Sequence, residues 1–366
     1  MKKQITVLFS AVTALCLLAG CAAGPSASQP ETSQPGADSS QTQQAELQRF
    51  SAPFYDVFDT VTTVIAYSES REEFDRQMDA LHEDLMAYHQ LFDIYNEYPD
   101  LVNLATVNRT AAEGPVKVDE RIMALLVEAK QQYQVTQGQT NVAMGSVLRL
   151  WHDARDAAVD GISTPPDPAD LEAANAHTSM DDLILDEEAG TVYFADPELK
   201  LDVGSCGKGY ACEMAARNAE ARGLTSAILS VGGNLRAIGE KPGNLPWTGG
   251  VENPEKPQEE IKAAVRLPHN YAMVTSGDYQ RFFTDAQGVK YHHLIDPETL
   301  QPANFTSSVT VITPDSGLAD CLSTGLFCMD PAEGLALVET IPNTEAFWCL
   351  PDGTTMQSSG FADLML

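Results

Sequence analysis

A long polar stretch near the N-terminus confines the folded part of this chain to the residues that follow it. Residues 22 to about 48 consist mainly of Ser, Gln, Pro, Ala, Gly and Thr, with almost no large apolar side chains. Such a segment cannot bury enough surface to offset the entropy lost on ordering, so it predicts a flexible tether. No second stretch of this kind and no internal repeat follows, which predicts one domain from about Phe50 to Leu366.

The extreme N-terminus predicts export. Two lysines precede an apolar run over residues 5–18, which is too short to span a bilayer and has the length of a signal-peptide core. The run ends in Leu18-Ala19-Gly20-Cys21, which resembles the lipobox of bacterial lipoproteins. We therefore predict a signal peptide over 1–20, a lipidated Cys21 with a flexible linker over 21–49, and a domain over 50–366. An ordinary secreted protein cut just after Cys21 is the alternative.

The charge and cysteine content of the chain limit the kinds of molecule that it is predicted to bind. The chain has 52 acidic and 22 basic residues and a formal net charge of −30. A surface that acidic repels nucleic acid and anionic lipid headgroups, so neither is a predicted partner, and a phosphorylated small molecule would need a divalent cation. Beyond Cys21 there are five widely spaced cysteines and no Cys-x-x-Cys pair. That pattern predicts neither a disulfide framework nor structural zinc.

The order of predicted elements favours an α+β fold. Apolar residues recur every three or four positions between Phe74 and Phe92, which predicts a helix after a strand at 58–67. Further helices are predicted at about 119–136, 145–158, 207–222 and 315–328, and strands at 183–185, 192–194, 199–203, 227–231 and through much of 261–312. Because strands cluster and pair sequentially, we predict largely antiparallel sheets with packed helices, not a doubly wound parallel fold.

Two segments suggest phosphate or metal chemistry. Gly204-Ser205-Cys206-Gly207-Lys208-Gly209 follows a predicted strand and opens a helix, where backbone amides favour phosphate. It lacks the spacing of a Walker A loop, and a tight turn is an equally good interpretation. Asp320 and Thr324 lie four apart on a predicted helix, so their oxygens share one face and suit magnesium better than zinc. In isolation, a solvated Asp and a back-bonded Thr explain this pair better.

Two further segments are weaker signals. In Tyr291-His292-His293-Leu294-Ile295-Asp296-Pro297, adjacent histidines on a strand face opposite ways, so at most one points into a site. Ser276-Gly277-Asp278-Tyr279 follows a predicted strand and is also explained as a turn. The absence of a Gly-x-Ser-x-Gly elbow from the sequence argues against a serine hydrolase.

Together these segments resemble the FAD:protein FMN transferases, the ApbE-type flavin transferases. The blocks in family order are Leu201-Asp202-Val203-Gly204…Gly207-Lys208-Gly209-Tyr210, Ser230-Val231-Gly232-Gly233-Asn234, Thr275-Ser276-Gly277-Asp278-Tyr279, His293-Leu294-Ile295-Asp296-Pro297 and Ala319-Asp320…Ser323-Thr324. Phe58-Asp59-Thr60, Asp93-Ile94-Tyr95-Asn96 and Asn141-Val142-Ala143-Met144-Gly145…Trp151 extend the resemblance, so that it covers nearly all of 55–330. Many members are lipoproteins, in agreement with the prediction for Cys21.

The resemblance implies a single catalytic domain of the ApbE-like, T-fold-related type. It implies magnesium-dependent transfer of FMN from the substrate FAD to a Thr or Ser hydroxyl of an acceptor flavoprotein, with release of AMP. Cleaving a pyrophosphate needs a cation to neutralise the anion and its developing charge. The implied acceptor is an exported flavoprotein subunit of a membrane redox complex. The lipid on Cys21 would be the only membrane contact, which places the enzyme outside the cytoplasm, anchored to the bacterial cell membrane.

The resemblance also implies residue roles. Asp320, Thr324 and the backbone carbonyl of Gly207 would bind Mg²⁺, with Ser323 as a further contributor. His293 would be the general base for the acceptor hydroxyl, a role that the intrinsic pKa of histidine suits. The other implied site residues are Asp278 and Asp296, which would organise the same pocket, and Phe58, Asp93, Ile94, Tyr95, Asn141, Met144, Tyr210, Ser276 and Ile295, which match family positions that contact FAD.

The sequence departs from the usual family pattern at several positions. Phe58-Asp59 replaces Met-Gly, Asn141 replaces the Asp of many members, and Cys206-Gly207 replaces Ile-Ala. A carbonyl ligand survives a side-chain change, so the metal site is predicted to persist. Cys206 and Cys321 flank the predicted ligands; two inert buried thiols are favoured over a redox-sensitive pair.

Two other functions stay as alternatives. The same site with water as the acceptor would be a magnesium-dependent FAD pyrophosphatase that gives FMN and AMP. A lipid-anchored flavin-binding protein without turnover belongs to another class. The pair Asp320 and Thr324 argues against it, because passive binding needs no catalytic magnesium.

Overall fold

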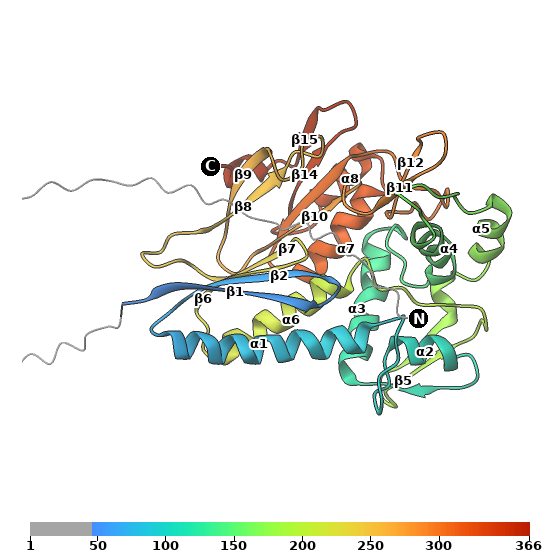
Figure 1. Ribbon diagram of the computed structural model, residues 1–366, viewed down its shortest axis with the longest axis horizontal. Coiled ribbons are helices and arrows are strands. Elements are labelled where there is room, and N and C mark those ends of the chain that lie inside the picture. Colours follow the sequence, from blue (N-terminus) through green and yellow to red (C-terminus); the bar gives the residue numbers. More distant parts are fainter. Residues whose placement is uncertain (1–45) are drawn as a thin grey trace, which may run out of the picture. The chain divides into compact units, whose positions relative to one another are not determined.

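An eight-stranded antiparallel sheet forms the centre of the protein (Figure 1). The structure is a computed structural model that describes residues 46–366. The predicted signal peptide, Cys21 and most of the linker lie outside the described residues. Every neighbouring pair in the sheet, whose order is β1-β2-β6-β7-β10-β13-β14-β15, is antiparallel. The predicted α+β class is therefore confirmed.

The strands of the central sheet are β1 (Gln48–Val57), β2 (Thr60–Ser68), β6 (Ser226–Val231), β7 (Asn234–Gly239), β10 (Ala272–Gly277), β13 (Ser308–Thr313), β14 (Glu345–Cys349) and β15 (Thr355–Gln357). Smaller sheets pair β3 (Val116–Lys117) and β4 (Leu183–Asp186) with β5 (Thr191–Phe194), β8 (Trp247–Glu252) with β9 (Ile261–Leu267), and β11 (Phe282–Thr284) with β12 (Lys290–His292). The helices are α1 (Arg71–Phe92), α2 (Leu104–Thr110), α3 (Glu120–Val135), α4 (Gly145–Asp156), α5 (Pro168–Asn175), α6 (Gly207–Ala221), α7 (Ser316–Phe327) and α8 (Pro331–Val338), with short 3₁₀ turns η1 (Met180–Asp182) and η2 (Phe361–Leu364). Within residues 46–366, no helix has the length and apolar character needed to cross a membrane.

Helices α1, α6 and α7 cover one face of the central sheet (Figure 1). Apolar side chains of α1 and α6 pack against β2 and β6, and those of α7 pack against β10 and β13. The β8–β9 hairpin and η2 cover the other face. Burial of these apolar surfaces is the main force that holds the layers together, and it sets α6 beside α7.

Local sequence explains where the helices begin. The side chains of Ser70, Asn103, Asp119 and Asp315 accept hydrogen bonds from backbone amides in the first turns of α1, α2, α3 and α7. These are the residue types that cap helix N-termini best. The turn between β1 and β2 holds Asp59 at φ 49°, in the left-handed region that favours glycine. This is the position at which the family's usual glycine is replaced.

One predicted strand is wrong. The segment 199–203 is not part of any sheet; it forms a single parallel bridge, between Lys200 and Met144. A Cβ at Gly145 would collide with the backbone of Lys200, so the start of α4 presses directly on this segment. The segment is therefore an extended stretch that packs against the start of α4 and pairs with no strand. The other predicted helices and strands are present, with ends shifted by a few residues.

Candidate functional site

The first turn of α6 touches α7 at one glycine. The amide nitrogen of Gly209 donates a hydrogen bond of 2.7 Å to Oδ2 of Asp320. A Cβ at Gly209 would collide with the carbonyl oxygen of Ser316 and with Cβ of Asp320, so only glycine permits this approach. The ammonium of Lys208 lies 3.7 Å from the same carboxylate oxygen. Asp320, only 4% exposed, is thereby fixed beside the first turn of α6, which begins at Gly207.

Hydroxyl oxygens gather next to this carboxylate. Oγ of Ser276, near the end of β10, lies 2.8 Å from Oγ of Ser323 and 3.3 Å from Oγ1 of Thr324. Ser323 also donates a hydrogen bond to the backbone carbonyl of Asp320. The structure thus brings together three predicted ligand residues of α7 and the predicted flavin contact Ser276, which are distant in sequence.

The donor set fits a hard cation. Oδ1 of Asp320 accepts no hydrogen bond within residues 46–366, whereas Oδ2 holds the amide of Gly209. Hydroxyls of Thr324 and Ser323 and the carbonyl of Gly207 add only oxygen atoms. The same part of the chain holds no cluster of three His, Cys, Asp or Glu side chains that could bind a metal. Oxygen donors with a single carboxylate suit Mg²⁺ and not zinc.

The two adjacent histidines differ in their hydrogen-bond partners, although both line one pocket, and only His292 belongs to strand β12. His292 is buried, with Nε2 2.8 Å from the carbonyl oxygen of Ala303, and its Nδ1 accepts the amide of Leu294. These bonds make it a neutral structural residue. His293 lines the same pocket, between α4 and the β11–β12 hairpin, and its Nδ1 is buried without a hydrogen-bond partner among residues 46–366. Such an atom can accept a hydrogen bond from a ligand hydroxyl or from an ordered water.

The pKa of His293 is set by its burial and by the charges around it. Burial lowers the pKa of His293 to about 3, and the nearby positive charges of Arg281, Lys208 and Arg155, together with His292, act in the same direction. Lys208 is the residue that also lies beside Asp320. The predicted metal ligands and the predicted base therefore share one electrostatic environment.

A chain of polar contacts links the predicted flavin residue Tyr95 to the loop before α6. Oη of Tyr95 lies 2.8 Å from Nδ1 of His152, and Nε2 of His152 lies 3.9 Å from Oδ2 of Asp202. The other oxygen of Asp202 accepts the amide of Gly204. Burial raises the pKa of Tyr95 to about 12 and lowers that of His152, so both are neutral near pH 7. Sequence interpretation missed His152, although it directly follows Trp151.

Several predicted flavin residues shape the walls of this region. Oδ1 of Asp93 accepts the amides of Tyr95 and Asn96, which fixes the loop that presents Tyr95. The amide side chain of Asn141 bonds to the backbone of Ala143 and Thr178 and so orders the approach to α4. Asn141 supplies a donor to Thr178 that an aspartate lacks.

The remaining predicted flavin residues pack in two apolar groups. Met144 and Ile295 lie with Trp151 in one cluster, behind the wall of the pocket that holds His293. Tyr210 lies in another with the partly buried Phe58 and Ile94. The two groups flank the Tyr95 loop and the start of α6.

The two predicted pocket aspartates differ in their partners. Asp278 lies 3.2 Å from the ammonium of Lys290, so it faces the β11–β12 hairpin. Both oxygens of the buried Asp296 bind its own turn, through the amide of Glu298 and the hydroxyl of Thr299. Asp296 is therefore suited to hold the segment after His293 in place.

The two cysteines beside the ligands are free and buried. A hydrogen bond with Cys206 and burial raise the pKa of Cys321 well above its ordinary value. Since the thiolate is the reactive form, this environment supports the interpretation of inert buried thiols.

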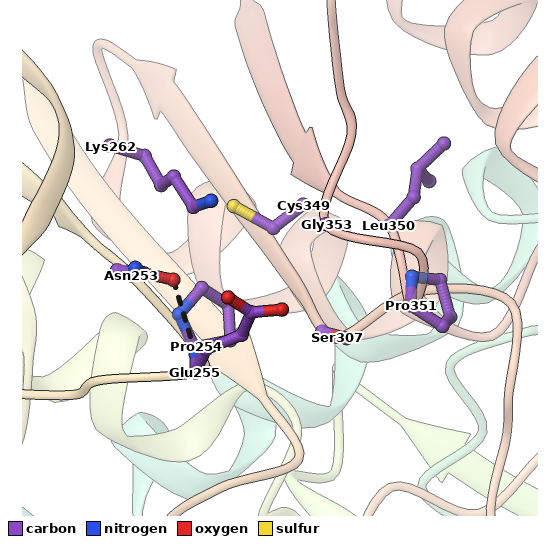
Figure 2. Close-up of a pocket in the computed structure, with 9 residues that line it drawn as sticks. All are labelled: Asn253, Pro254, Glu255, Lys262, Ser307, Cys349, Leu350, Pro351 and Gly353. Carbon is purple, nitrogen blue, oxygen red and sulfur yellow. Dashed lines mark hydrogen bonds between the residues drawn. The ribbon is translucent and has the colours of Figure 1, made fainter.

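A different pocket lies between the β8–β9 hairpin and the β14–β15 turn (Figure 2). Its walls include Lys262, Ser307 and Cys349, and Figure 2 shows the Lys262 ammonium directed toward the thiol. It contains none of the predicted site residues. The candidate site is therefore the region formed by α4, α6, α7 and the β11–β12 hairpin.

Comparison with known proteins identifies the family. The sequence model of the ApbE family matches residues 58–348. The chain is 32% identical over 276 residues to the FAD:protein FMN transferase of Treponema pallidum, covering 71% of this chain and 74% of the relative. It is 28% identical over 268 residues to the FAD:protein FMN transferase of Vibrio cholerae, covering 73% and 75%.

Solved structures of proteins named ApbE have the same fold as this chain. The ApbE protein from Thermotoga maritima superposes with a TM-score of 0.77 at 27% identity, covering 87% of this chain and 100% of that chain. The flavin transferase ApbE from Vibrio cholerae superposes with a TM-score of 0.73 at 25% identity, covering 87% and 99%. The chain belongs to the ApbE family.

Proposed function

We propose that this protein transfers FMN from FAD to a Thr or Ser hydroxyl of an acceptor flavoprotein, with Mg²⁺ as cofactor and AMP as the second product. The observation that carries the proposal is the contact between the first turn of α6 and α7, which fixes Asp320 beside Gly209 and sets Thr324 beside Ser276. Lys208 of the same turn lies beside Asp320 and also acts on the pKa of His293, whose Nδ1 is buried without a partner among residues 46–366. The relatives named FAD:protein FMN transferase support the reaction class. No observation favours water as the acceptor.

The chemistry assigns a role to each group. Bound at Asp320, Thr324 and the Gly207 carbonyl, Mg²⁺ would neutralise the pyrophosphate and the charge that develops on AMP. The oxygen of the acceptor hydroxyl forms a bond to the phosphorus of the FMN half of FAD, and Nδ1 of His293 accepts the proton of that hydroxyl. The phosphorus–oxygen bond to AMP breaks, and AMP carries away the electron pair. Lys208 adds positive charge beside Asp320.

The acceptor in this proposal is a flavoprotein subunit of a membrane redox complex. The test uses the full chain with FAD, Mg²⁺ and a purified acceptor domain of that class, and it measures in-gel flavin fluorescence and the FMN mass on the acceptor. We expect label that disappears with EDTA. Metal-dependent AMP without label would indicate the pyrophosphatase, and bound FAD with neither product would indicate the binding protein.

His293 predicts an unusual pH profile. Because burial and neighbouring cations lower the pKa of His293 to about 3, its ring is neutral and able to accept a proton at any higher pH. We expect kcat/KM, measured from initial rates of flavin labelling, to show no acid limb near the ordinary histidine pKa of about 6.5. His293→Gln should lower kcat/KM by about 10²- to 10⁴-fold at every pH in that range.

His177→Gln is the matched control, since His177 pairs with Asp196 away from the site. It should keep the wild-type rate and profile. An acid limb near pH 6.5 that is present in the wild type and absent from His293→Gln would refute the lowered pKa of His293 but support its role as the base, whereas a wild-type rate in His293→Gln would refute that role.

We further propose that Cys21 anchors the enzyme to the outer face of the bacterial cell membrane through a diacylglycerol. The motivation is the lipobox-like sequence before Cys21 and the polar linker after it. We expect the N-terminal peptide of membrane-extracted protein to begin at Cys21 and to carry the lipid mass. Cys21→Ser should abolish that mass and the membrane association. A mature N-terminus at another residue would refute the anchor.

A further inference from the structure

The pocket of His293 is lined mainly by aromatic rings and is bordered by two arginines. Phe283 and Tyr291 are cross-strand partners in the β11–β12 hairpin, with ring centroids 5.3 Å apart. Trp151 of α4 lies 5.8 Å from Tyr291 and completes the wall. Arg155 from α4 and Arg281 from the start of the hairpin line the same pocket. The pocket therefore combines two guanidinium groups with a small apolar enclosure.

These arginines are poorly neutralised by the protein. Arg281 makes no ion pair and no side-chain hydrogen bond with any residue in 46–366. Among the same residues, Arg155 forms an ion pair only with its neighbour Asp156, at 3.6 Å, and the side chain of Asp156 is 73% exposed. In a chain with a net charge of −30, most arginines have close carboxylate partners. Two weakly paired arginines at one pocket create a local positive field that attracts anions.

The pocket also joins the two ends of the predicted dinucleotide site. His152, another lining residue, contacts Tyr95 on one side and lies near Asp202 on the other. Asp202 holds the loop that leads to Gly207, a predicted metal ligand. Arg155 and Arg281 line the same pocket as His152, which places them beside this connection between Tyr95 and the loop before α6.

We propose that Arg155 and Arg281 form an anion subsite that binds a phosphate of the nucleotide, in FAD before the reaction and in AMP after it, separately from the metal ligands. The inference rests on the proposed function, whose substrate and product it concerns. A guanidinium binds phosphate through paired, charge-assisted hydrogen bonds. The pocket itself is small and lined mostly by apolar surface, so the phosphate would bind to the guanidinium groups that border it and not inside it.

The test measures AMP and inorganic phosphate binding to the full chain by calorimetry, in EDTA so that no metal contributes. The variants are Arg155→Gln, Arg281→Gln and Arg281→Lys. Arg149→Gln is the matched control, because Arg149 lies on the same helix and pairs with Asp153 outside the pocket. Arg281 is exposed, so its replacement leaves the fold intact; circular dichroism checks this for every variant.

We expect the wild type and Arg149→Gln to bind AMP equally, and each Gln variant to bind about tenfold more weakly, as loss of a charged hydrogen bond predicts. Arg281→Lys should retain part of the affinity. The KM for FAD should rise in the same order. Inorganic phosphate that binds with the same variant pattern supports a subsite for the phosphate itself; phosphate that does not bind while AMP does would overturn that assignment.

Three other results would also overturn the subsite. The first is that AMP does not bind in EDTA, and the second is that both Gln variants bind AMP as tightly as the wild type. The third is that the variants raise only the KM of the acceptor, which would instead place an acidic acceptor segment at these arginines. Failure of the subsite and failure of the proposed function are distinguishable. Flavin transfer with arginine-independent AMP binding rejects the subsite alone, and arginine-dependent AMP binding without any transfer rejects the function alone.

Discussion

Asp320→Asn is expected to lower the rate of FMN transfer by about a thousandfold or more, with the fold intact. The asparagine oxygen can still accept the hydrogen bond from Gly209, so α6 and α7 should stay in contact. What is lost is the single carboxylate charge among the predicted metal ligands. A cation that stabilises a transferring phosphoryl group contributes several kcal/mol, and about 4 kcal/mol corresponds to about a thousandfold in rate. Initial rates of flavin labelling, titrated with Mg²⁺, measure the effect.

Asp315→Asn is the control for this change. Asp315 caps the same helix one turn earlier, and asparagine caps a helix N-terminus about as well as aspartate. It should therefore transfer FMN at close to the wild-type rate. If Asp320→Asn were as active as Asp315→Asn at every Mg²⁺ concentration, the proposed metal site would be wrong.

The spacing of apolar residues predicted the helices correctly and one strand wrongly. In both cases the spacing reports which side chains are buried, and not which hydrogen bonds the backbone makes. The apolar positions of α1 recur with the helical period because one face is buried, and that signal needs no knowledge of the partner. Leu199, Leu201 and Val203 alternate in the same way because all three are buried. Burial of alternate residues indicates an extended chain with one covered face, but it does not reveal whether a neighbouring strand supplies hydrogen bonds. Here the hydrogen bonds come from the side chain of Asn108 in α2 and from the backbone of Val142 and Gly145, at the approach to α4.

The edge strand β1 shows the opposite case. Its burial is weak along most of its length, because only β2 pairs with it. Phe50, Ala52 and Phe54 alternate along the sequence and are partly buried against the core, but the alternation is short and adjoins the polar stretch, so β1 is not among the predicted strands.

The site depended on contacts between distant residues. Gly209 and Asp320 lie 111 positions apart, and Tyr95 and His152 lie 57 apart. The spacing of residues within one helix can suggest the pair Asp320 and Thr324. It cannot show that α7 lies so close to α6 that only glycine fits at position 209. The resemblance to a known family was what grouped these segments into one site. Arg281 gave no such signal, since a single arginine near a turn is usually a solvated charge.

The interior that holds α6 and α7 together contains a buried ion pair, and its loss should strongly destabilise the protein. Glu213 of α6 accepts hydrogen bonds of 2.7 and 3.0 Å from Arg236 of β7 and one of 2.9 Å from the amide of Ser316 at the start of α7. The side chains of Glu213 and Arg236 are 3% and 4% exposed. Burial by itself would raise the pKa of Glu213, but the bonds to Arg236 and Ser316 hold it below its ordinary value.

Glu213→Ala should therefore lower the free energy of unfolding by about 3–5 kcal/mol, because it leaves the Arg236 guanidinium buried without its partner. Denaturant unfolding measures the loss. Glu220→Ala is the matched control: Glu220 lies on the same helix, 3.4 Å from the same arginine, but is 28% exposed, so its loss should cost about 1 kcal/mol or less. The double change Glu213→Met with Arg236→Met should recover most of the stability, since no buried charge remains. Equal losses in Glu213→Ala and Glu220→Ala would show that burial of the pair is not what fixes α6 against α7.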